Sequence, residues 1–346
     1  MKKNKLIGLV TFMVIMLLLG MQLSHAGDPA RIGTASGEQV LIPVGARSMA
    51  MSGANAAYTS GLEAIYWNPA GFSRMNTRAA GMFSTMQIFG DISVNYLAVG
   101  VSAGQFGNFG FSVKSLGFGD IPLTTLEDSD GASGQTFSPS FVTGALTYSR
   151  ALTDAIYVGI SGKLISESVP RASANAFAFD IGIQYQATGN IPGFSMGLVV
   201  KNIGTKVQYS GSAFLAPATD VGATSSDFRE RPTASHKLPA TVELGVGYVR
   251  QVAEDHSLMV NGNFSNNNFG NDDWKLGLEY MFTDLVALRG GYIFTENVES
   301  EEQLFTYSLG LGLHYNVSGT DLMFNYAYRA QQYFDGNNLF EFVIGF

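Results

Sequence analysis

The last eight residues of the chain alternate strictly between two kinds of side chain and end on an aromatic residue. One face of this segment holds Phe340, Phe342, Ile344 and Phe346. The other face holds Leu339, Glu341, Val343 and Gly345. Alternation with a period of two predicts a strand with one apolar and one mixed face. A chain that ends on an outward aromatic residue predicts the last strand of an outer-membrane β-barrel, with Phe346 as its assembly signal. A soluble β protein can also end on phenylalanine, so the rest of the chain has to decide.

The N-terminal residues have the three regions of a secretory signal. Lys2, Lys3 and Lys5 precede an apolar run, and Ser24 and Ala26 place small residues at −3 and −1 of a cut after Ala26. We therefore expect residues 1–26 to be a cleaved signal peptide for Sec-dependent export. The alternative is an uncleaved anchor, because the run is about long enough to cross a bilayer.

Composition and charge favour a transmembrane barrel over other β proteins. Charged residues make up only 14% of the chain, aromatic residues make up 12%, and 41 residues are glycine. No later apolar run reaches the roughly 18 residues of a membrane helix. A secreted β-sandwich array is the alternative, but it would normally carry more surface charge.

Loss of the three signal lysines shifts the net charge from −8 to −11, which argues against a nucleic-acid partner. With no cysteine, the chain contains no disulfide.

Alternating segments continue from Ala79 to the end of the chain. We count fourteen, separated by turn residues, and their connections alternate between short and mostly longer ones. The longer ones lie near 117–139, 166–174, 208–239, 265–272, 295–305 and 329–338. Short periplasmic turns and longer outer loops are typical of outer-membrane barrels. Aromatic residues also end the even-numbered strands at the short-turn side, as an interfacial girdle would: Tyr148, Tyr185, Tyr248, Tyr280, Tyr315 and Phe346. Residues 79–346 are therefore predicted to form a 14-stranded antiparallel all-β transmembrane barrel.

The two longest connections, 117–139 and 208–239, are rich in Ser, Thr, Asp, Gly and Pro. Connections of this length without regular structure are usually functional or mobile. We interpret them as exposed loops that could bind a partner or substrate. The alternative is that they are mobile loops without a binding function.

Residues 27–78 do not alternate as strands do. They contain a run of small residues with one arginine, including Gly45, Ala46 and Arg47, and then the sequence Trp67-Asn68-Pro69. Small residues allow close backbone packing, and Asn-Pro is a turn signal. We therefore expect an N-terminal plug inside the lumen. In that position Arg47 would meet a lumen carboxylate such as Glu243 or Glu279, because burial of an unpaired charge is costly.

Several charged residues lie between apolar neighbours on predicted strands. The candidates for lumen-facing charges are Asp180, Glu243, Lys275, Glu279 and Arg289, with Glu341 in the same pattern. An arginine or lysine at the lipid midplane costs about 2–4 kcal/mol, which favours the lumen side. They could line a polar path, but mutual neutralisation with the plug is the simpler interpretation.

The stretch Ile65-Tyr66-Trp67-Asn68-Pro69-Ala70-Gly71 resembles the plug motif of the FadL-like barrels. The wider pattern resembles one branch, the PorV/PorQ family, and the resemblance runs through the mature chain in order. It is carried by Gly33-Thr34-Ala35, Val44–Met51, Phe177–Gly182, Leu238–Thr241 and Leu288–Tyr292. The resemblance implies a fourteen-stranded outer-membrane barrel with an N-terminal plug.

Two functions remain open from this resemblance. The PorV/PorQ branch implies a non-enzymatic component of type IX secretion that binds or shuttles secreted cargo proteins through their C-terminal β-domains. The shared plug motif implies the alternative, FadL-like transport of a hydrophobic small molecule. Expected partners are outer-membrane lipid, the barrel-assembly machinery at the C-terminal strand, and either secreted cargo or secretion-machinery subunits.

Motifs for catalysis or metal binding are not found in the sequence. After signal cleavage His236, His256 and His314 remain, in separate segments, without an HExxH or His-carboxylate spacing. There is no Gly-x-Ser-x-Gly elbow. We therefore predict no catalytic residues, no cofactor and no metal, and rank an enzyme third among the functions.

Overall fold

The computed structural model describes residues 29–188, 191–219, 227–299 and 301–346. The predicted signal peptide, residues 1–26, lies outside these residues. No helix within the described ranges is long and apolar enough to cross a membrane.

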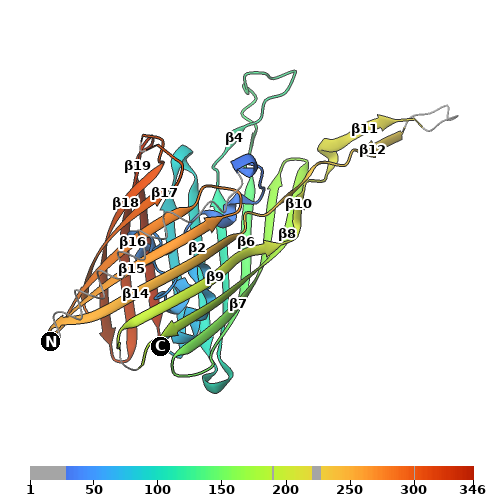
Figure 1. The fold of residues 1–346 in the computed structure, drawn as a ribbon. Coiled ribbons are helices and arrows are strands. Elements are labelled where there is room, and N and C mark those ends of the chain that lie inside the picture. The colour runs from blue at the N-terminus through green and yellow to red at the C-terminus, as the bar shows by residue number, and fades with distance from the viewer. Residues whose placement is uncertain (1–28, 189–190, 220–226, 300) are drawn as a thin grey trace.

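Fourteen antiparallel strands of the described chain close into a barrel (Figure 1). In order around the barrel they are β1 (Ala79–Gln87), β2 (Ser93–Ser102), β3 (Asn108–Gly117), β6 (Ser140–Ala151), β7 (Ile156–Val169), β8 (Ala172–Gln186), β9 (Phe194–Gly204), β14 (Thr241–Ala253), β15 (His256–Asn267), β16 (Asp273–Phe282), β17 (Val286–Thr295), β18 (Phe305–Val317), β19 (Thr320–Gln331) and β20 (Asn337–Gly345). The barrel closes where β1 pairs with β20, from Ala80↔Gly345 to Met86↔Leu339. Closure pairs the backbone groups that an open sheet edge would expose, as a structure in lipid requires. The predicted 14-stranded antiparallel barrel is confirmed.

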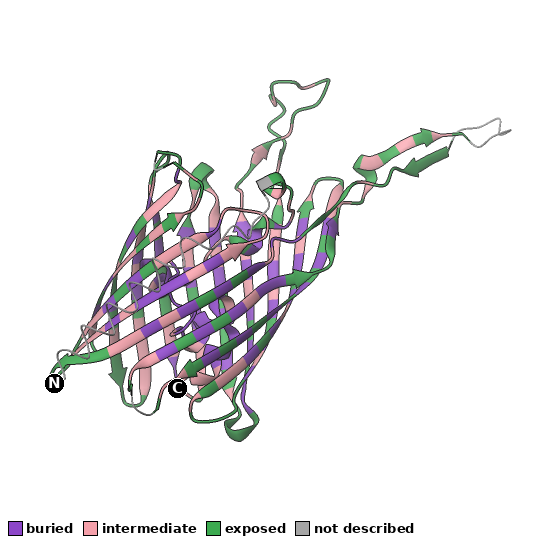
Figure 2. Cartoon of the chain, viewed as in Figure 1, coloured by how far each residue is buried: buried purple, intermediate pink, exposed green. Residues whose placement is uncertain are grey.

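The two faces of the strands differ as the alternation predicts (Figure 2). On β8, Phe177, Phe179 and Ile181 are about half exposed on the outer face. The residues between them, such as Ala178 and Asp180, are buried on the inner face. An apolar outer face and a packed, partly polar interior suit a barrel surrounded by lipid.

The chain ends at the seam of the barrel, at the short-turn side. Phe346 follows β20, and its backbone oxygen accepts hydrogen bonds from the backbone nitrogens of Arg78 (2.6 Å) and Ala79 (3.1 Å). Its side chain is exposed. These contacts hold the terminal residue beside the start of β1; its role as an assembly signal stays a prediction.

The longer connections are more ordered than the sequence indicates. The connection 117–139 contains the ribbon β4 (Ile121–Pro122) and β5 (Thr136–Phe137). The connection 208–239 contains η7 (Ser212–Phe214) and parts of two ribbons. These are β10 (Lys206–Gln208) with β13 (Ser235–Lys237), and β11 (Leu215–Ala218) with β12 (Asp227–Glu230). Both connections project beyond the barrel rim (Figure 1).

The predicted longer connection 166–174 is wrong. Strand β7 continues to Val169 and β8 begins at Ala172, so only a tight turn joins them. Arg171 in this turn has a left-handed φ of 68°. The Ser-Glu-Ser sequence at 166–168 has turn-like composition, but it belongs to a pair of strands longer than most of the others.

Residues 29–78, called the inner segment below, pack against the inner faces of the strands. They contain η1 (Pro29–Arg31), η2 (Glu38–Leu41), α2 (Ala46–Ala50), η3 (Gly61–Glu63), α3 (Ala64–Trp67) and η4 (Pro69–Arg74). Two further short helices, η5 (Phe89–Asp91) and η6 (Gly104–Phe106), lie in the connections after β1 and β2. One apolar cluster joins Leu62, Ile65 and Phe72 of the inner segment to Met82 and Tyr96 of the barrel wall. The hydrophobic core of this chain therefore lies inside the barrel.

Candidate functional site

Two carboxylates, Glu63 of the inner segment and Glu341 of β20, contact the start of α2. Gly45 has a left-handed φ of 85°, and a Cβ there would lie 2.5 Å from Oε1 of Glu63. Only glycine suits this position, because a side chain would be strained and would collide with Glu63. The backbone nitrogen of Ala46 donates to Oε2 of Glu341 on β20 at 2.9 Å. The predicted residues Gly45 and Ala46 thus bring α2 against the wall.

Arg47 lies against Glu279 of β16, one of the two carboxylates proposed from the sequence. Its Nη2 is 2.7 Å from Oε1 and its Nε is 2.9 Å from Oε2. This is a two-bond guanidinium–carboxylate pair, which fixes orientation as well as charge. Glu279 raises the pKa of Arg47 above its ordinary value, since the carboxylate stabilises the cation against burial.

Glu279 also accepts from Arg289 on β17, and the contacts continue around the barrel. Nη1 of Arg289 donates to Oδ1 of Asn325 at 2.7 Å, and Nδ2 of Asn325 donates to Oε1 of Glu341 at 2.6 Å. We call the set Arg47, Glu279, Arg289, Asn325 and Glu341 the Arg47 network. It links α2 to β16, β17, β19 and β20.

Trp67, Asn68 and Pro69 form the turn from α3 to η4. Trp67 donates from Nε1 to the carbonyl of Val44 at 2.8 Å. Asn68 is fully buried and caps η4: its Oδ1 accepts from the nitrogen of Ala70 at 3.2 Å, and its Nδ2 donates to the carbonyl of Ala56 at 2.8 Å. Pro69 follows as the first residue of η4, a position that suits its missing N–H.

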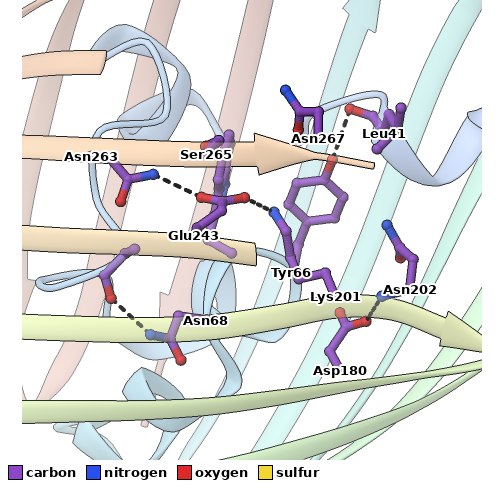
Figure 3. A network of polar contacts seen from close by, with 12 residues as sticks. Leu41, Tyr66, Asn68, Asp180, Lys201, Asn202, Glu243, Asn263, Ser265 and Asn267 are labelled. Carbon is purple, nitrogen blue, oxygen red and sulfur yellow. Dashed lines mark hydrogen bonds and ion pairs between the residues drawn. The ribbon is translucent and has the colours of Figure 1, made fainter. Parts of the chain in front are cut away.

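A second set of polar contacts lies on the inner faces of β7, β8, β9, β14 and β15 (Figure 3). Glu243 forms an ion pair with Lys201 and accepts from Nδ2 of Asn263 at 2.8 Å. Asp180 forms an ion pair with Lys163 and accepts from the backbone nitrogen of Asn202 at 2.8 Å. Glu243 therefore does not meet Arg47, the other possibility raised by the sequence. Lys275, also predicted to face inward, donates to Oγ of Ser265 at 3.0 Å.

Several inward polar residues were missed by sequence reasoning. Besides Glu63, Lys163, Lys201 and Asn202 they include Lys114, which donates to the carbonyl of Ile42, and Arg329, which donates to Oδ1 of Asn337. Lys201 and Asn202 lie at a β-bulge, where the register of β8 and β9 shifts between Phe179 and Ile181. Asn202 has a left-handed φ of 60°. Because one extra residue in a strand reverses the inside–outside alternation, a period-two pattern could not assign this end of β9.

A cavity of about 270 Å³ lies between the inner segment and the wall. We call it the outer cavity, because its lining includes the β15–β16 connection and strand ends next to other long connections. Its aromatic lining residues are Tyr66, Trp67, Phe269 and Phe305. Lysine and arginine side chains also line it. Such a chamber can hold a small molecule by apolar contact and orient it by charge.

A smaller cavity of about 150 Å³ lies toward the short-turn side. Arg47 lines it, whereas Met49 of the same short helix lines the outer cavity. Helix α2 therefore lies between the two cavities. Within the described ranges, no group of three or more His, Asp or Glu side chains could hold a metal ion.

No protein-family model matches the chain, and no curated protein matches it in sequence. Solved structures do. The toluene transporter TbuX of Ralstonia pickettii is similar at 14% identity and a TM-score of 0.52, over 87% of this chain and 97% of that chain. The toluene transporter TodX of Pseudomonas putida is similar at 12% identity and a TM-score of 0.53, over 87% and 97%. The monoaromatic hydrocarbon channel CymD is similar at 13% identity and a TM-score of 0.50, over 88% and 97%.

These likenesses show the fold. The closed 14-stranded antiparallel barrel is similar to the structures of these transporters and agrees with the architecture that the FadL-like resemblance implies. The three similar proteins are transporters or channels. None of them bears on the narrower PorV/PorQ prediction, which stays a prediction from sequence motifs.

Proposed function

We propose that this chain is a non-enzymatic outer-membrane conduit for a hydrophobic small molecule. The observation that carries the proposal is the pair of cavities separated by α2, the outer one lined by aromatic side chains. The transport of toluene by proteins of the same fold supports it. This is the alternative function from the sequence, and it takes precedence over the cargo shuttle.

In the proposed mechanism α2 is the barrier. A molecule that enters the outer cavity contacts Met49 of α2. To pass toward the short-turn side it requires α2 to move, which breaks the ion pair between Arg47 on α2 and Glu279 on the barrel wall. The two-bond ion pair holds the closed arrangement because each charge would otherwise be left partly buried. Movement of the inner segment then joins the two cavities.

Uptake measurements test the conduit. We expect a strain without this protein to accumulate radiolabelled toluene more slowly than the parent strain, and wild-type protein from a plasmid to restore the rate. The assay should be limited to initial rates at low toluene concentration, where passive diffusion contributes least. Equal initial rates of toluene uptake in the two strains would contradict the proposed conduit.

The cargo shuttle of type IX secretion remains a second candidate, because loop 208–239 projects far from the barrel and exposes Phe228. Replacing residues 210–232 with a short Gly-Ser linker separates the two functions. The conduit predicts unchanged toluene uptake, since none of the described residues in this range lines either cavity. The shuttle predicts that secreted proteins with C-terminal β-domains accumulate in the periplasm. Normal export by this variant would count against the shuttle.

A further inference from the structure

Two cations at the outer cavity form no direct ion pair with a carboxylate of the described residues, although Lys275 also interacts electrostatically with Glu243 and Asp273. Lys275 donates to the hydroxyl of Ser265, and Arg329 donates to Oδ1 of Asn337 at 2.9 Å. Four other inward cations, Arg47, Lys163, Lys201 and Arg289, each form an ion pair with a strand carboxylate. Lys114, which is also buried, instead donates to the backbone carbonyl of Ile42 at 2.8 Å. Charges in the wall of a barrel are normally paired, because burial without a partner is costly. Lys275 and Arg329 therefore leave room for an anion from outside the chain.

The acidic residues that line the same cavity are occupied or exposed. Glu243 is paired with Lys201. Asp273 accepts from Oγ1 of Thr295 at 2.8 Å and from Nδ2 of Asn267 at 3.0 Å. Glu38 is exposed to solvent, which screens its charge. None of these carboxylates forms a direct ion pair with Lys275 or Arg329.

Aromatic rings stand next to these cations. The Arg329 guanidinium lies 3.6 Å from the ring centroid of Phe305. Gly53 brings Lys275 close to Trp67: a Cβ built on Gly53 would lie 2.7 Å from the Trp67 ring and 3.8 Å from Cδ of Lys275. A ring bound against Trp67 or Phe305 would thus place an attached anionic group within reach of a cation.

We propose, building on the proposed conduit, that the outer cavity binds a small aromatic carboxylate. The carboxylate of this ligand accepts hydrogen bonds from Lys275 and Arg329, and its aromatic ring packs against Trp67 and Phe305. Charge-assisted hydrogen bonds to a carboxylate are about twice as strong as neutral ones. A cavity of about 270 Å³ suits a one- or two-ring compound rather than a larger ligand.

Tryptophan fluorescence gives a direct test, since the chain has two tryptophans and only Trp67 lines the cavity. In a Trp274→Phe background, detergent-purified protein is titrated with benzoate, toluene and benzylamine. We expect saturable quenching by benzoate, at a concentration at least about tenfold below that for toluene, and the weakest response to benzylamine.

Charge variants in the same background locate the contact. Lys275→Met and Arg329→Met are each expected to weaken benzoate binding by about tenfold and leave toluene binding within about twofold. Lys206→Met is the control, because Lys206 is exposed on β10 and does not line the cavity. Each variant is first checked for heat-modifiable migration in gels, so that only folded barrels are titrated.

The outcomes separate this inference from the conduit. Tighter benzoate binding that depends on Lys275 and Arg329 supports the aromatic acid. Equal binding of toluene and benzoate, or benzoate binding that both variants retain, overturns it and leaves a conduit for neutral compounds. Absence of quenching by all three probes also overturns it, and the toluene uptake assay then decides whether the conduit stands.

Discussion

Replacement of Gly182 by valine is expected to force the inner segment away from the barrel wall while the barrel itself persists. A Cβ built on Gly182 would lie 2.0 Å from Oδ1 of Asn68 and 3.0 Å from Cδ of Pro69. Gly159, on the neighbouring strand β7, faces the same turn, with Pro69 backbone atoms 2.3 Å from its Cβ position. Neither contact can be relieved by a rotating side-chain tip alone, because Asn68 is fully buried and hydrogen-bonded.

The energetic cost of this substitution has two parts. Extra atoms in a packed interior cost typically about 1–3 kcal/mol. Displacement of Asn68 also leaves buried partners such as the carbonyl of Ala56 without a donor, at about 1–3 kcal/mol each. The barrel strands keep their ladder hydrogen bonds, so the loss falls on the inner segment.

Limited trypsin digestion measures this displacement. In Gly182→Val we expect rapid cleavage at Arg47 and Arg74. Both are partly buried in the wild-type protein, in which we expect them to resist digestion. Gly144→Val is the matched control, since Gly144 has no atom within 4 Å of its Cβ position. The same digestion pattern in both variants and in the wild type would show that the close approach at Gly182 is not required.

The barrel could be predicted from sequence because its physical requirements are local and repeated. Lipid on one side and a packed lumen on the other force the period-two alternation of segments such as β8 and β18. Loop lengths then fixed which side carries the short turns. The prediction failed for 166–174, where polar strand residues extend beyond the lipid and have the composition of a turn.

The site was predictable in part, for a different physical reason. A charge between apolar neighbours had to face the lumen, and this placed Asp180, Glu243 and Glu279 on the inner side. The partners of these charges depend on register and on the path of the inner segment, which alternation does not encode. The bulge hid Asn202, which is buried out of phase with the alternation of β9. The carboxylate partner of Arg47 was left open between two residues until the fold placed Glu279 beside it.

Removal of Glu279 is expected to destabilise the closed arrangement more than removal of Arg47. Glu279 accepts from both Arg47 and Arg289, so Glu279→Ala leaves two guanidinium groups without their carboxylate. Breaking a buried pair in this way costs about 3–5 kcal/mol. In Arg47→Ala, Glu279 keeps Arg289 as its partner, and the side chain of Arg47 is 27% exposed. Its loss is therefore expected to cost less.

Thermal unfolding of SDS-treated barrels, followed by heat-modifiable gel migration, ranks these variants. We expect the transition temperature to fall most in Glu279→Ala, less in Arg47→Ala and not at all in Glu254→Ala, an exposed carboxylate in the β14–β15 turn. In planar bilayers both network variants should also show more frequent opening than the wild type, because the ion pair holds α2 between the two cavities. An Arg47→Ala barrel with unchanged heat resistance and unchanged conductance would rule out the Arg47–Glu279 pair as the closing contact. A Glu279→Ala barrel that loses heat resistance but stays closed would instead assign the network to stability alone.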